Sequence, residues 1–180
     1  MITIIGAGAI GTTLAALLSS EETEISILSK KDNKDEQELI LENFRGRTVR
    51  KKVKVINTLD ESDWYILAVK SYDVEELIKT LKNRTARILC CQNGIKTYNL
   101  LKNELDEKRL SYMVTGMGCS KIDTGKSEFK GSGFTFIGEF SGEIGDQINE
   151  LASKMNESEI ECEVVNNIFN YDEIFMFLIV

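Results

Sequence analysis

The chain has 180 residues, of which 42% are apolar and 28% charged, and its formal net charge is −7. This length predicts a single domain with one sizeable core and excludes a second large domain. The acidic balance argues against nucleic acid and anionic membrane surfaces as partners, so an anion site would have to be built locally. Histidine is absent from the sequence, which leaves Lys, Glu, Asp or Tyr for any proton transfer.

The four cysteines are predicted to be small core residues. They show no C-x-x-C spacing, and a metal site made from them would lack a histidine ligand, so we predict no metal site. They are Cys90, Cys91, Cys119 and Cys162. No signal peptide precedes the first apolar stretch, and a reduced cytoplasm is the expected location.

The N-terminus contains the most informative motif. An apolar, β-branched run (ITII) leads into GAGAIG and then into an apolar helical stretch (TTLAALL), which is the strand, turn and helix of the dinucleotide-binding fingerprint G-x-G-x-x-G. Gly6 allows the tight turn, Gly8 lets the backbone approach a pyrophosphate, and Gly11 lets helix and strand pack closely. The phosphates would lie against the first amides of the helix, at Ala9 and Ile10. The alternative is a tight strand-to-helix turn that binds no ligand.

The end of the second predicted strand, residues 24–28, bears on the choice of coenzyme. An acidic side chain about 20 residues after the glycines holds the ribose 2′-hydroxyl of NAD, whereas a basic one accommodates the 2′-phosphate of NADP. This sequence has Ser29, Lys30 and Lys31 there, followed by Asp32. The pattern favours NADP(H) as the cofactor. The alternative is that the two lysines are solvated surface residues.

A charged region follows. Residues 32–43 are charged and then briefly helical in pattern, and residues 45–47 have the composition of a turn. Residues 48–55 alternate and are rich in cations, which predicts an exposed strand with one solvated face. A nucleic-acid patch would need interleaved aromatic residues for stacking, so we favour a basic edge strand that discourages edge pairing.

Two buried parallel strands are predicted at residues 63–70 and 87–91, each followed by a helix. Lys70 and Asn93 therefore fall at the carboxyl ends of parallel strands, the edge where open α/β sheets bind ligands. Lys70 supplies a cation, and Asn93 supplies an amide that can donate and accept hydrogen bonds. Each also has a simpler explanation, because lysines often end strands and Asn-Gly is a common turn.

The last third of the chain predicts an antiparallel extension of the sheet. Its elements are a strand at 112–115 that runs into residues 116–119, a glycine-punctuated stretch at 125–133, a strand at 134–138, a helix at 143–155 and a strand at 161–165. The predicted fold class is α/β, a Rossmann-like doubly wound, mostly parallel sheet with this antiparallel extension near the C-terminus. We expect a dinucleotide-binding domain over residues 1–167 and a connector helix or apolar interface segment over residues 168–180.

Four motifs in this order resemble the N-terminal half of the ketopantoate reductases (2-dehydropantoate 2-reductases). They are GAGAIG at the start, AVKSYD at 68–73, CQNG at 91–94 and the late block GMGCSKIDTGKSEFKGSGFTFIG. The resemblance covers about residues 1–175. It implies an oxidoreductase domain that binds NADPH, from which hydride passes to the ketone of ketopantoate in pantothenate and coenzyme A biosynthesis.

The resemblance also implies roles for individual residues. Gly6, Gly8 and Gly11 would form the pyrophosphate turn, and Lys30 or Lys31 would meet the 2′-phosphate. Lys70 and Asn93 would flank cofactor and substrate in the cleft.

The sequence departs from the family near its C-terminus. The family continues into an all-helical substrate domain that begins with a motif like W-x-K-L-x-x-N, whose lysine is the general acid. Here Phe175 aligns with the aromatic residue, Leu178 with the leucine and Phe177 with the lysine. Phenylalanine cannot donate a proton, so no catalytic residue is assigned. We expect a chain truncated relative to the family, which binds the nucleotide but has little or no reductase activity unless a helical domain completes the 2-keto acid site.

The run Ile174–Val180 is apolar throughout and too short to cross a bilayer, which needs roughly 20 residues. It is expected to pack on its own sheet or to form an interface with a second copy or another protein. Two alternative functions remain for the chain. One is a non-catalytic NADP(H)-binding or sensing module that acts through a partner, and the other is a remnant that has kept no ligand.

Overall fold

The computed structural model describes residues 1–29, 35–92 and 95–171. Its strands are β1 (Ile2–Ile5), β2 (Ile25–Leu28), β3 (Glu36–Phe44), β4 (Arg47–Ile56), β5 (Trp64–Leu67), β6 (Arg87–Cys90), β7 (Leu110–Thr115), β8 (Gly118–Asp123), β9 (Lys126–Gly131), β10 (Thr135–Glu139) and β11 (Cys162–Val164). Its helices are α1 (Ala9–Leu18), α2 (Val74–Leu81), α3 (Ile95–Lys102) and α4 (Asp146–Glu157), with short 3-10 turns at Ser71–Asp73 and Glu107–Arg109.

All the described strands belong to one sheet in the order β11-β10-β7-β6-β5-β1-β2-β4-β3-β9-β8. The central strands, from β4 through β2, β1, β5 and β6 to β7, run parallel. The pairs β3–β4, β7–β10 and β8–β9 are antiparallel. The predicted mostly parallel, Rossmann-like sheet with an antiparallel part is therefore confirmed.

Helices cover both faces of this sheet, as in a doubly wound fold. Leu14 of α1 and Leu151 of α4 belong to the apolar core on one face, whereas Leu77 of α2 and Leu101 of α3 belong to the core on the other. Each buried strand supplies apolar side chains to both cores because alternate residues point to opposite faces. The core thus lies in two layers, one on each side of β1.

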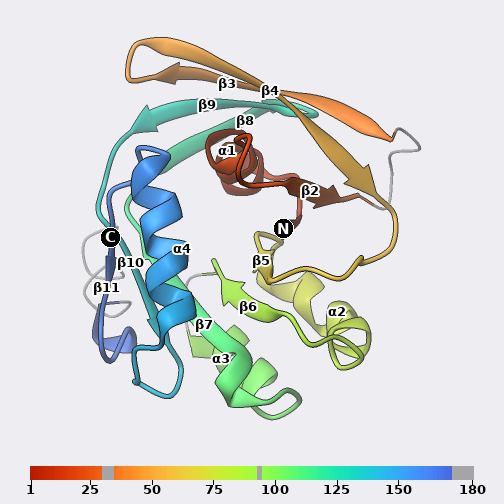
Figure 1. The fold of residues 1–180 in the computed structure, drawn as a ribbon, viewed down its shortest axis with the longest axis vertical. Helices are drawn as coiled ribbons and strands as arrows, with labels where there is room; N and C mark the ends of the chain where they lie inside the picture. The colour runs from red at the N-terminus through yellow and green to blue at the C-terminus, as the bar shows by residue number, and fades with distance from the viewer. Residues whose placement is uncertain (30–34, 93–94, 172–180) are drawn as a thin grey trace.

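Helix α1 is enclosed rather than laid on a flat surface. The strands β3, β4, β8 and β9 curl over it (Figure 1), and every residue from Gly11 to Leu18 is buried. Its sequence contains no charged residue, so the helix presents no side to water. The curl of the sheet therefore fixes α1, and with it the glycine turn that precedes the helix.

Two expectations for the middle of the chain were wrong. Residues 36–44 form strand β3 instead of a helix, because Leu39 and Leu41 face the core while the strand pairs with β4 on one side and β9 on the other. The basic strand exists as β4, but it lies between β2 and β3 and is not an edge.

The antiparallel part is also larger than expected. It includes the antiparallel pair β3–β4 and the hairpin β8–β9, and these two pairs are joined by a parallel pairing of β9 with β3. The pairing of β9 with β3 joins residues that are distant in sequence, so no local pattern predicts it.

Candidate functional site

The candidate site lies at the carboxyl edge of the central strands. Ile5 of β1 is opposite Leu67 of β5, and Leu67 is opposite Cys90 of β6. Because these strands are parallel and in register, the segments that follow them leave the sheet side by side. These segments are the glycine turn, the exit of β5 and the exit of β6. The structure therefore brings together Gly6, Gly8, Gly11 and Lys70.

Two of the three glycines are required by packing within the protein. Gly6 has φ +113°, and a Cβ there would lie 2.8 Å from Val69 Cγ1 and 2.9 Å from the carbonyl of Ala68. A Cβ on Gly11 would lie 1.9 Å from Gly6 O. The turn and the helix thus pack against the β5 exit at distances that only glycine permits, as the motif predicts.

Gly8 is different, because packing within the protein does not require a glycine there. It precedes α1 with φ −80° and ψ −171°, a conformation open to any residue, and its carbonyl accepts a hydrogen bond from Thr12 N at 2.9 Å. A Cβ would meet only Ala68 O, at an ordinary contact distance of 3.8 Å. Apart from its chain neighbours, Ala68 O is the one described atom within 4 Å of that Cβ position, so packing does not explain the glycine, whereas the close approach of a ligand would.

The start of α1 is electrostatically suited to an anion. The first amides of a helix have no partner within the helix and carry partial positive charge. Ala9 and Ile10, the first two residues of α1, are half-buried. The first turn of α1 holds no acidic side chain, and Gly8 makes no side-chain cap. A phosphate would therefore meet neither a competing carboxylate nor a capping hydroxyl.

Lys70 follows β5 and is exposed at the same edge. Its main chain is extended, with φ −67° and ψ 152°, and its carbonyl accepts a hydrogen bond from Asp73 N at 3.0 Å. This bond begins the 3-10 turn that leads into α2. Lys70 is thus carried at this edge by a segment with defined backbone geometry.

Gln92 was not among the predicted site residues, although it belongs to the CQNG motif. Its side chain is buried, and Nε2 donates to Leu67 O at 2.9 Å and to Val69 O at 3.0 Å. Tyr112 Oη donates to the main-chain carbonyl of Gln92. The sequence signal was a polar residue directly after the apolar run of residues 88–91, where burial implies hydrogen-bonded partners.

The thiols near the edge are not activated. Burial raises the pKa of Cys90 and of Cys91 above the usual value for a thiol, so both remain neutral at physiological pH. Within residues 1–29, 35–92 and 95–171, no group of His, Cys, Asp and Glu side chains could hold a metal ion. Across the same ranges, no helix is long and apolar enough to span a membrane.

Several predicted residues lie outside the described part of the chain. These are Lys30, Lys31, Asn93 and the run Ile174–Val180, which includes Phe175, Phe177 and Leu178. The residue before the lysines is placed, since Ser29 N donates to Ile56 O at 3.0 Å and so continues β2 alongside β4.

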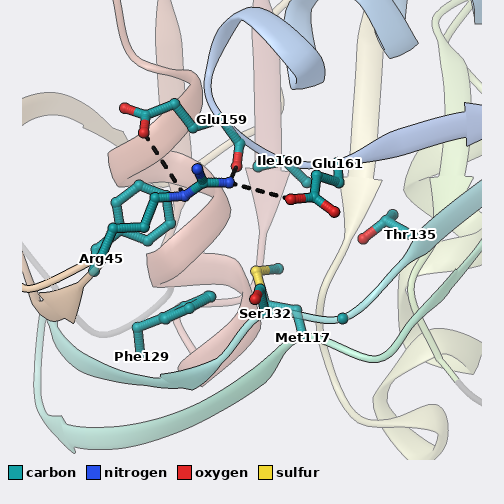
Figure 2. Close-up of a pocket in the computed structure, with 10 residues that line it drawn as sticks. Arg45, Met117, Phe129, Ser132, Thr135, Glu159, Ile160 and Glu161 are labelled. Atoms are coloured by element: carbon teal, nitrogen blue, oxygen red, sulfur yellow. Dashed lines mark hydrogen bonds and ion pairs between the residues drawn. The ribbon is translucent and has the colours of Figure 1, made fainter.

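A separate small cavity lies between the β3–β4 turn and the loop from α4 to β11 (Figure 2). Arg45 spans it, with Nη2 3.4 Å from Glu161 Oε1 and Nε 3.7 Å from Glu159 Oε2. Phe129 and Met117 form apolar walls. The cavity has a volume of about 20 Å³, which is enough for a water molecule and far too small for a nucleotide.

A family model described as "Ketopantoate reductase PanE/ApbA" matches residues 2–142. The chain belongs to the ketopantoate reductase family. A 2-dehydropantoate 2-reductase of Archaeoglobus fulgidus is 25% identical over 166 residues, which cover 92% of this chain and 56% of that protein. The chain thus spans just over half the length of the relatives it matches.

Solved structures confirm the fold of this family member. The 2-dehydropantoate 2-reductase of Geobacter metallireducens matches with a TM-score of 0.80 and 21% identity, covering 92% of this chain and 57% of that one. D-mandelate dehydrogenase in a ternary structure with NADH and anilino(oxo)acetate matches with a TM-score of 0.78 and 21% identity, covering 94% and 58%.

Proposed function

We propose that this chain is the dinucleotide-binding domain of a ketopantoate-reductase-like oxidoreductase. The observation that carries the proposal is the contrast among the three glycines. Packing accounts for Gly6 and Gly11, whereas an added Cβ at Gly8 would make only an ordinary contact with Ala68 O, so packing does not account for this glycine. Gly8 directly precedes the first amides of α1, at Ala9 and Ile10, where a pyrophosphate would be held.

The proposed coenzyme is NADP(H). Ser29 directly follows β2, and its amide donates to Ile56 O. Lys30 and Lys31 come next in the sequence, where a basic side chain would meet a 2′-phosphate. D-mandelate dehydrogenase, of similar fold, was solved with NADH. A shared fold therefore does not determine which coenzyme is preferred, and the preference has to be measured. Lys70 and Asn93 are proposed to line the cleft beside the nicotinamide.

The proposed substrate class is a 2-keto acid, with ketopantoate as the first candidate. Hydride transfer to a ketone creates an alkoxide, which needs a proton donor held in a cleft from which water is excluded. By resemblance the lysine that serves as general acid is replaced by Phe177. We therefore propose that residues 1–180 bind the coenzyme but reduce ketopantoate slowly or not at all without a helical domain supplied in cis or in trans.

A second function is favoured by the same replacement. A dinucleotide domain without its general acid is suited to hold or sense NADP(H) and to signal through a partner that contacts the apolar run Ile174–Val180. The partner would be another protein or a second copy of this chain.

Titration of the chain with NADPH and NADH, followed by nicotinamide fluorescence or calorimetry, tests the common part of both proposals. Saturable binding with NADPH preferred is expected, and lack of binding by either coenzyme would contradict both. NADPH oxidation in the presence of ketopantoate then separates them. Rapid turnover by the chain alone would disprove the sensing function and the role given to Phe177.

A further inference from the structure

Gln92 joins the exits of two neighbouring strands from a position that is only 7% exposed. Its Nε2 uses both hydrogens, one on Leu67 O at 2.9 Å and one on Val69 O at 3.0 Å. The two acceptors are carbonyl oxygens, so the amide cannot be turned round without placing Oε1 against them. The side chain therefore has one orientation, in which β6 holds the segment that leaves β5.

The other side of that segment rests on the glycine turn. Ala68 N donates to Ile5 O at 2.9 Å, and Gly6 packs so closely that a Cβ would lie 2.8 Å from Val69 Cγ1. The exit of β5 is thus held between the turn and the Gln92 amide. A displacement of Val69 would be passed to the pyrophosphate turn on one side and to Lys70 on the other.

Gln92 is itself held in place by a third strand, β7. Tyr112 of β7 is 1% exposed, and its hydroxyl donates to the main-chain carbonyl of Gln92. Its ring stacks on Phe169 with centroids 5.7 Å apart. Gln92 Oε1 is buried without a hydrogen-bond partner among the described residues.

We propose that Gln92 is a positioning residue for the dinucleotide site, which sets the place of Lys70 and supports the Gly6 turn from behind. It acts through the carbonyls of Leu67 and Val69 and does not contact the coenzyme. This inference deepens the proposed function and rests on it.

The test compares Gln92→Met with Thr3→Val. Methionine keeps the length and apolar stem of glutamine but has no donor. Thr3 is a matched control because it is also buried in the central sheet and its hydroxyl also makes two side-chain hydrogen bonds, to Ser26 Oγ at 2.8 Å and to Ser62 Oγ at 2.7 Å. It lies on β1 away from the carboxyl edge, so its loss lowers stability without disturbing the site.

Two readouts are needed, both on the full chain. In the absence of nucleotide, amide hydrogen exchange of residues 68–72 is expected to be at least about tenfold faster in Gln92→Met than in the wild type or in Thr3→Val. Loss of the two hydrogen bonds lowers the free energy of local opening of this segment, which is separate from global stability. The dissociation constant for NADPH is expected to rise about tenfold in Gln92→Met and to stay within about twofold in Thr3→Val.

The two proposals fail in different ways. If the wild type binds no dinucleotide, the proposed function is disproved, and exchange at residues 68–72 still decides whether Gln92 positions this segment. If exchange in Gln92→Met matches that in Thr3→Val, Gln92 is an ordinary core residue and the inference is overturned. Faster exchange with unchanged NADPH affinity would also overturn it, since the segment would then be irrelevant to the site.

Discussion

Replacing Gly8 with alanine is expected to weaken dinucleotide binding while leaving the fold intact. The new Cβ would lie 3.8 Å from Ala68 O, an ordinary contact, and φ −80° is accessible to alanine. Alanine precedes a helix less favourably than glycine by about 0.5–1 kcal/mol. Its lower entropy in the unfolded chain offsets this by about 0.4–1 kcal/mol. The free energy of unfolding should therefore change by no more than about 0.5 kcal/mol.

Affinity should change far more than stability. The methyl group would occupy the space through which a pyrophosphate approaches the backbone, so the phosphates would be displaced from the amides of Ala9 and Ile10. We expect the dissociation constant for NADPH to rise at least about tenfold, which corresponds to ~1.4 kcal/mol. NADH should lose affinity to the same extent, because both coenzymes share the pyrophosphate.

Two matched glycine-to-alanine variants define the comparison. At Gly131 in β9, no described atom outside its chain neighbours lies within 4 Å of the added Cβ, so affinity should not change and the free energy of unfolding should rise by about 0.4–1 kcal/mol. At Gly11 the Cβ would lie 1.9 Å from Gly6 O, an overlap that costs roughly 3 kcal/mol. For a domain of this size that cost lowers the melting temperature by roughly 6–12 °C.

The assay is a fluorescence titration with NADPH together with thermal unfolding of all three variants. If Gly8→Ala binds NADPH as tightly as Gly131→Ala, the turn is not the pyrophosphate site. If Gly8→Ala melts as low as Gly11→Ala, the space beside Gly8 is not open and the reasoning fails at the structural step.

Three further predictions concern other parts of the molecule. The double variant Lys30→Ala, Lys31→Ala should raise the dissociation constant for NADPH about tenfold and that for NADH less than about twofold; equal losses would exclude a 2′-phosphate contact. Arg47→Ala breaks an exposed ion pair with Glu159, so urea unfolding should show a loss below about 1 kcal/mol. That loss should shrink in about 1 M salt, and a loss independent of salt would contradict an electrostatic origin. Burial raises the pKa of Cys162 from 9.0 to about 12, so this thiol contributes stability that is complete below pH 9 and is lost as pH rises toward 12. Cys162→Ala should weaken that alkaline loss, and an unchanged pH profile would refute the assignment.

The sequence by itself determined the strand, turn and helix with which the fold begins. The spacing of Gly6, Gly8 and Gly11 after a β-branched run specifies a strand, a turn and a helix, because each step depends on local backbone conformation. The continuous apolar runs around β5 and β6 likewise predicted buried parallel strands, and so predicted which edge would carry Lys70.

The tertiary structure decided the features that depend on distant partners. Residues 36–44 became a strand because β4 and β9 pair with them, and this overrode the local helical pattern. The same pairing curled the sheet over α1 and removed β4 from the edge. Gln92 shows the same limit at the site. Its role depends on the carbonyls of Leu67 and Val69, which are more than twenty positions away in the sequence. Such hydrogen bonds leave no periodic pattern in the sequence, because they form only once the strands are aligned.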